Sequence, residues 1–290
     1  MLWKMEYGAR TSDLKHWNSY HYYNFLHLSD SYFKRTDMVE SIMKRLWPIM
    51  DNLAKKVDFR IVANFTNYVL TGAVKTLCGI GHPSCVKAST LLWNEGSSVW
   101  QEGYEEFNQW VKNRSSLEGV VVMGMLLRFG SPEKQGTISS WIRETDNKKV
   151  ALEVLAYCSN VSFIEMFARE NYMSLAEIQP PKGLVSTAFH KAAFRVAISM
   201  PEAVRRIDGY IMGLHICIPS LVIDSEEELN MYIAKLSSLN CSESVVDQGL
   251  DQVRVSLAKV KRGTPGLLRW LNGELPPAVP EPSASMETLK

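Results

Sequence analysis

Basic residues concentrate in one stretch of the chain, which suits that stretch to binding an anionic polymer. Residues 182–215 carry a net excess of three positive charges, whereas the whole chain of 290 residues has a formal net charge of +1. Such a local cluster of Lys and Arg can bind nucleic-acid phosphates without reading base sequence. The cluster and one histidine predict an RNA-binding surface made of Lys182, His190, Lys191, Arg195, Arg205 and Arg206. The alternative interpretation is an ordinary solvated helix face.

The sequence offers little other chemistry. Cys78, His82 and Cys85 are residue types found in zinc sites, but a fourth ligand and a second cysteine pair are missing. Acidic clusters at 102–106 and 224–228 suit a helix surface and a helix N-terminus. No phosphate-binding loop, dinucleotide fingerprint, zinc-protease motif or serine-hydrolase motif occurs. We therefore expect no metal, no cofactor and no enzymatic activity.

Composition is that of a globular protein, with 46% hydrophobic and 22% charged residues. Five cysteines at irregular spacing do not form a disulfide framework, so we expect a reducing, cytoplasmic environment. Met1–Tyr7 lacks the apolar stretch of a signal peptide, and no apolar run reaches the roughly 18–20 residues that span a membrane. No membrane association is expected, and the four glycosylation sequons are interpreted as chance.

Helical periodicity and capping residues recur through most of the chain. Capping boxes or Ser-Pro starts open predicted helices near Asp37, Ser98, Ser131 and Ser225. The apolar run 120–127 predicts a buried helix or strand. Residues 147–168 predict one or two helices. A helix over 244–262 is expected to end at Gly263, with a short one starting at Thr264. Hairpin turns and alternating strand patterns are scarce, so the predicted fold is all-α with a multi-helix core.

Three regions are predicted along the chain. Residues 1–36 are rich in aromatic side chains without a clear period. They could fold over the protein's own core, dock as an arm on a neighbouring subunit, or stack on bases. Residues 37–272 form the helical core, and a Pro-Pro break near 179–183 could divide it into two helical lobes. Residues 273–290 are Pro-rich and are predicted to be a disordered tail.

Short motifs between Glu106 and Arg195 resemble the core of coat proteins of flexuous filamentous plant viruses, the potyvirus type above all. Helical nucleocapsid proteins of other RNA viruses form a wider group of similar architecture. The resemblance rests on Glu106-Phe107-x-x-Trp110, Val121-Val122-Met123-Gly124-Met125-Leu126-Leu127, Gly130-Ser131-Pro132, Ser162-Phe163-Ile164-Glu165-Met166-Phe167, and Gly183-Leu184 followed by Ala193-Phe194-Arg195. It implies a helical core with a basic groove and arms that link neighbouring subunits.

Two positions depart from the family pattern. The family's RNA-site arginine is absent at Ile164–Glu165, and its aspartate after Ala-Phe is Arg195 here. The family's RNA pocket is therefore not carried over as such. A charge-swapped pair of Glu165 with Arg195 is the expected replacement.

Together these observations favour a non-enzymatic nucleocapsid or coat protein that polymerises on single-stranded RNA through a basic groove and inter-subunit arms. Its partners would be RNA and further copies of itself, and its location the virion or the host cytoplasm. The alternative is a helical adaptor that binds another protein and has no affinity for RNA.

Overall fold

The computed structural model describes residues 19–62, 68–171, 183–199, 222–238 and 243–274. All regular structure in these residues is helical, which confirms the all-α fold. The first helices are α2 (Ser19–Tyr32), α3 (Thr36–Ala54), α4 (Tyr68–Gly79), α5 (Pro83–Glu95), α6 (Ser97–Trp100) and α7 (Tyr104–Lys112). The later ones are α8 (Gly119–Phe129), α9 (Pro132–Glu144), α10 (Lys148–Leu155), α11 (Val161–Glu170), η2 (Leu184–Ser186), α13 (Thr187–Ser199), α16 (Glu226–Ser238) and α17 (Glu243–Leu271).

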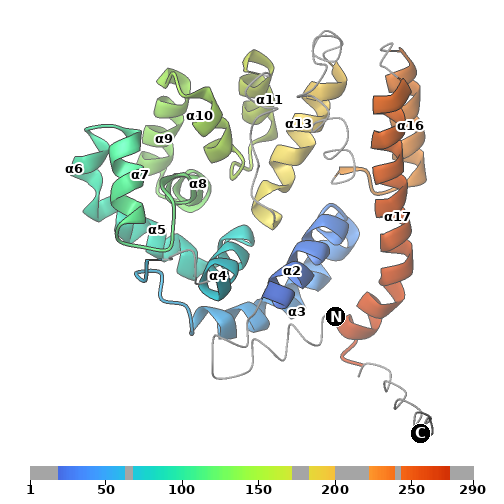
Figure 1. Cartoon of the computed structure of the whole chain (residues 1–290), viewed down its shortest axis with the longest axis horizontal. Coiled ribbons are helices and arrows are strands. Elements are labelled where there is room, and N and C mark those ends of the chain that lie inside the picture. Colours follow the sequence, from blue (N-terminus) through green and yellow to red (C-terminus); the bar gives the residue numbers. More distant parts are fainter. Residues whose placement is uncertain (1–18, 63–67, 172–182, 200–221, 239–242, 275–290) are drawn as a thin grey trace, which may run out of the picture.

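The helices follow one another around the molecule, so that α17 packs against α2 and α3 (Figure 1). Helix α8 is largely buried, because its sequence is apolar on almost every side. Val122, Met123 and Leu126 are fully buried between α5, α7, α9 and α10. A side chain at Gly124 would overlap the ring of Tyr157, so glycine permits this close contact.

Helix α2 corrects the prediction of an irregular N-terminal arm over residues 1–36. Phe25, Leu28 and Tyr32 lie at helical spacing and are buried in the main core. The buried polar residues of this segment are His21, Asn24, Ser29, Ser31 and Lys34. These polar residues obscure the apolar period in the sequence, so the pattern does not indicate a helix. Residues 19–36 therefore belong to the protein's own core, and only residues 1–18 of the predicted arm lie outside the described residues.

Helix α17 runs through the predicted stop at Gly263, so that boundary was wrong. A Cβ at Gly263 would lie 2.6 Å from the hydroxyl oxygen of Tyr32. The Tyr32 hydroxyl donates to the carbonyl of Val260 at 3.4 Å. The glycine thus permits close packing of α2 on α17 instead of ending the helix. Pro265 also lies within this helix, where it removes one backbone N–H donor.

The main hydrophobic core continues across the predicted lobe boundary near 179–183. One cluster of buried side chains extends from Phe25 to Trp270 and includes Val185, Phe189 and Val196. A second, smaller cluster joins α16 and α17 around Ile223, Leu229, Tyr232, Leu250 and Val253. The structure therefore does not divide the described core at that boundary. Of the predicted tail, residues 275–290 lie outside the described residues.

Candidate nucleic-acid interface

The structure describes three of the six residues predicted to bind RNA. His190 on α13 is only 8% exposed, so it is a core residue rather than a surface cation, and that assignment is corrected. Lys191 is half-buried, and Arg195 is exposed. Lys182, Arg205 and Arg206 lie outside the described residues. Of the predicted set, the described residues place two side chains at the surface, Lys191 and Arg195, one turn apart on α13.

The expected pair of Glu165 and Arg195 is confirmed. Arg195 Nη1 donates to Glu165 Oε1 at 3.0 Å and links α13 to α11, which pack along each other. One turn further along the same helices, Arg169 donates to the hydroxyl of Ser199 at 2.8 Å. The Arg195 side chain is 61% exposed, so the pair stabilises the fold only modestly. Because Glu165 neutralises its charge, Arg195 is a weak candidate for binding phosphate.

A stronger basic surface lies on α17, outside the stretch that the sequence interpretation selected. Residues 252–273 contain five basic and no acidic residues. All five side chains are exposed, and four recur at intervals of seven or eight residues, which places them on one helix face. We call the four residues that share this face, Arg254, Lys261, Arg262 and Arg269, the α17 stripe.

The α17 stripe is little neutralised by neighbouring acids. Arg254 makes a loose ion pair with Asp251 at 3.4 Å. No carboxylate of the described residues lies within ion-pair distance of Lys261, Arg262 or Arg269. The stripe extends about 22 Å along the helix at 1.5 Å per residue. A row of exposed cations of this length can contact several phosphates of one strand.

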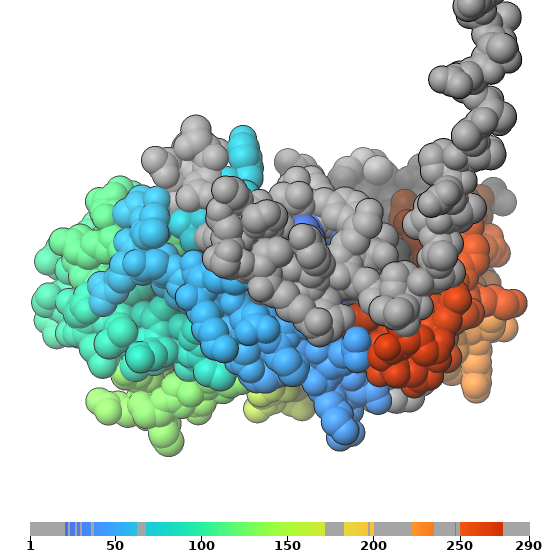
Figure 2. Space-filling view, turned by 90° about the horizontal axis from the view of Figure 1, so that it is seen from below, coloured from blue at the N-terminus to red at the C-terminus, as the bar shows by residue number. Residues whose placement is uncertain are grey.

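Two basic side chains from the N-terminal part of the chain pack against α17. The Lys34 ammonium is buried and donates to the hydroxyl of Ser256 at 3.1 Å. The Arg45 guanidinium of α3 lies over the ring of Trp270, 5.2 Å from its centroid. Figure 2 shows α17 in red at one end of the molecule, beside the blue N-terminal helices. Lys34 is only 4% exposed and Arg45 is half-buried, so the exposed positive charge at this end of the protein comes mainly from α17 itself.

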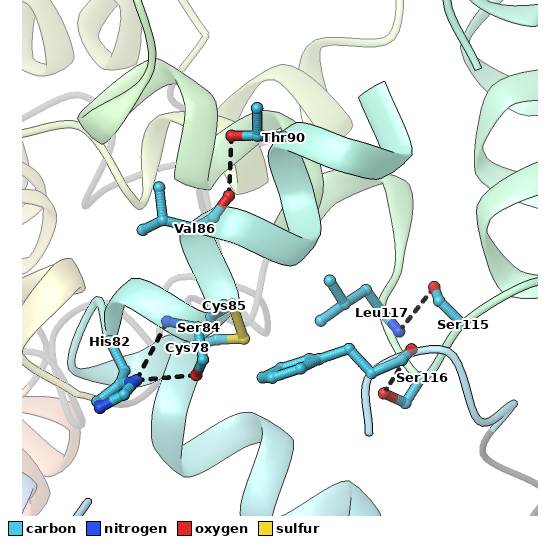
Figure 3. Close-up of a disulfide and its surroundings, with 10 residues drawn as sticks. Cys78, His82, Ser84, Cys85, Val86, Thr90, Ser115, Ser116 and Leu117 are labelled. Carbon is cyan, nitrogen blue, oxygen red and sulfur yellow. Dashed lines mark hydrogen bonds between the residues drawn. A yellow bond between two sulfur atoms is a disulfide. The ribbon is translucent and has the colours of Figure 1, made fainter. Parts of the chain in front are cut away.

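The residues considered for zinc form a different structure. Cys78 at the end of α4 and Cys85 at the start of α5 are joined by a disulfide (Figure 3). The sequence pattern indicates no disulfide framework and a reducing environment; this bridge pairs two of the five cysteines, so their sulfurs are not thiolate ligands. Cys158 is a buried free thiol. Across the described ranges no group of three His, Cys, Asp or Glu side chains could hold a metal ion.

His82 connects this disulfide loop to α3. Its Nδ1 accepts from the N–H of Ser84 at 3.2 Å, so Nε2 carries the proton and donates to Asp51 Oδ1 at 3.1 Å. The ring also stacks on Trp47, with 5.3 Å between centroids. Ser84 Oγ lies 2.8 Å from Nδ1, which gives a serine, a histidine and an aspartate in series.

This series lacks what acyl-transfer chemistry needs at the same place. The N–H of Ser84 is bonded to the imidazole, and those of Cys85 and Val86 are bonded to the carbonyl of His82. The first turn of α5 therefore has no N–H left to stabilise an oxyanion. The observed bonds cap α5 and hold the α4–α5 loop against α3.

Comparison with known proteins adds no relative: no protein-family model, curated protein or solved structure matches this chain. Within the described residues, no helix is both long and apolar enough to cross a membrane. The fold and the surface charge thus define an all-α protein with a basic surface on α17.

Proposed function

We propose that this protein coats single-stranded RNA through backbone phosphates and without reading base sequence, as a nucleocapsid or coat protein does. The observation that carries the proposal is the α17 stripe, a row of exposed cations that the described carboxylates leave almost unneutralised. Binding by such a row depends on counterion release and therefore weakens steeply with salt. No catalytic role is assigned to the protein.

The proposed assembly on RNA differs from the sequence expectation in one respect. Residues 19–36 are part of the protein's own core, so they are not available as an arm to a neighbouring subunit. A subunit-linking segment at this end would have to lie before Ser19, where α2 begins. Such head-to-tail contacts produce closed rings or open helices, according to whether the rotation between subunits closes.

The decisive experiment compares two variants that lose the same number of positive charges. The first variant replaces Arg254, Lys261, Arg262 and Arg269 with Gln. The control replaces four exposed lysines on other helices with Gln, namely Lys75, Lys87, Lys112 and Lys149. Fluorescence anisotropy with a mixed-sequence 20-nucleotide RNA at several salt concentrations gives the affinity and its salt slope.

The stripe variant should bind at least tenfold more weakly, and its salt slope should fall by about 0.7 for each phosphate that the protein no longer neutralises. The control should stay close to wild type. Equal losses in both variants would show a nonspecific effect of net charge and refute the assignment. Protein that purifies free of nucleic acid, forms no rods or rings in negative stain, and does not bind the RNA would instead favour a helical adaptor.

A further inference from the structure

Arg128 is a half-buried cation for which the described residues provide no anion. It lies in the last turn of α8, which Figure 1 shows nearly end-on. Its Nη1 donates to the carbonyls of Tyr157 at 3.2 Å and Val185 at 2.8 Å. No described carboxylate lies within ion-pair distance of it. A charge removed from water without a counter-ion is costly, so a bound anion would stabilise this position.

The two carbonyl bonds fix the guanidinium without using all of its donors. They come from the α10–α11 connection and from η2, so three separate segments hold Arg128 in one orientation. Nε and Nη2 make no hydrogen bond with described residues, and neither is among the buried polar atoms that lack a partner. These two nitrogens therefore retain contact with solvent. A guanidinium held in this way presents a planar fork that suits a phosphate group.

An exposed aromatic ring lies directly beside this cation. Phe129 is 43% exposed, and the Arg128 guanidinium carbon is 5.3 Å from its ring centroid. The ring packs against Gly81, where a Cβ would come within 2.6 Å of it. Gly81 has a φ of 72°, so the loop conformation also favours glycine here. The loop therefore holds the ring at the surface and leaves part of it accessible.

We propose that Arg128 and Phe129 form a binding site for one nucleotide, with the phosphate on the free edge of the guanidinium and the base on the exposed part of the ring. Proteins that hold single-stranded nucleic acids combine positive charge for the backbone with aromatic rings on which the bases stack. Burial lowers the pKa of Arg128, in keeping with a cation that lacks a compensating charge. That the nucleotide belongs to an RNA strand rests on the proposed function, whereas the phosphate site itself does not.

The test uses thermal unfolding of the full chain with inorganic phosphate, uridine and uridine 5′-monophosphate. A ligand at ten times its Kd should raise the Tm of the wild type by about 2–3 °C. Uridine 5′-monophosphate should act at lower concentration than phosphate, and uridine alone should have little effect. Arg128→Gln should abolish the shift, and Phe129→Ala should reduce the nucleotide's effect to that of phosphate.

Arg143 provides a matched control, because its guanidinium also lies over an aromatic ring, Phe163, at 5.4 Å. Arg143→Gln should keep the full shift. Phosphate salts stabilise most proteins weakly, so the relevant quantity is the shift in excess of that of Arg128→Gln. If Arg128→Gln does not fold, Arg128→Lys takes its place, since it keeps the charge but not the fork. Arg128→Lys should bind phosphate at least tenfold more weakly than the wild type does.

A shift of equal size in wild type and in the Arg128 variant would overturn the site. A second measurement needs no variant: an RNA carrying 5-iodouridine should photo-crosslink to the peptide that contains Phe129. Crosslinks confined to other peptides would refute RNA as the source of the nucleotide. Loss of RNA affinity in the variant of the α17 stripe would be a separate result. That variant keeps Arg128 and Phe129, so it should still show the phosphate-dependent rise in Tm.

Discussion

Replacing Phe25 with Ala tests whether the N-terminal aromatic segment belongs to the protein's own core. Phe25 is fully buried on α2, and its ring centroid lies 6.2 Å from that of Phe33 in an edge-on contact. The substitution removes the ring from the main core and leaves a cavity, which costs about 3–5 kcal/mol. Domains are usually stable by only about 5–15 kcal/mol. A large fraction of the free energy of unfolding should therefore disappear.

The assay is urea unfolding followed by circular dichroism at 222 nm, together with sedimentation to measure the assembly state. Phe25→Ala should unfold at a much lower urea concentration, with no change in assembly of the fraction that is folded. Leu91→Ala is the control, because Leu91 is 42% exposed and its truncation should cost well under 1 kcal/mol. A Phe25 variant with unchanged stability but altered assembly would refute the assignment of this segment to the protein's own core. It would favour an arm that docks on a neighbouring subunit.

Three further predictions follow from individual contacts. A double-mutant cycle on Glu165 and Arg195 should give a coupling of about 0.2–1 kcal/mol in urea unfolding, because Arg195 is largely exposed; additive effects would remove the pair. Burial raises the pKa of Glu153, so its ionisation destabilises the fold above that pKa. Glu153→Gln should therefore be more stable than wild type at pH 7, and a difference that persists below about pH 4 would contradict this. Reduction of the Cys78–Cys85 disulfide should cost about 2–3 kcal/mol for so short a loop, measured by unfolding with and without dithiothreitol; the double Ser variant should be insensitive to the reductant.

The sequence predicts helices well where the signal lies within one turn. Ser131 followed by proline indicates a helix start, and α9 does begin at Pro132, with the Ser131 hydroxyl accepting from the N–H of Lys134. The apolar run 120–127 forms the buried helix α8. The basic stretch of α17 is also readable, since it is a long segment without an acidic residue. These features depend on neighbours in the chain, so no tertiary information is needed to find them.

Contacts between distant segments decided the rest. Lys34 is buried because it reaches Ser256, and Gly263 continues a helix because Tyr32 packs against it. The orientation of the Arg128 guanidinium is fixed by hydrogen bonds to carbonyls of residues 29 and 57 positions later in the chain. A lysine, a glycine or an arginine has the same local preferences at each of these places as elsewhere. Only the packing of the helices determines which distant groups these residues meet, and thus whether they are solvated, buried or poised to bind a ligand.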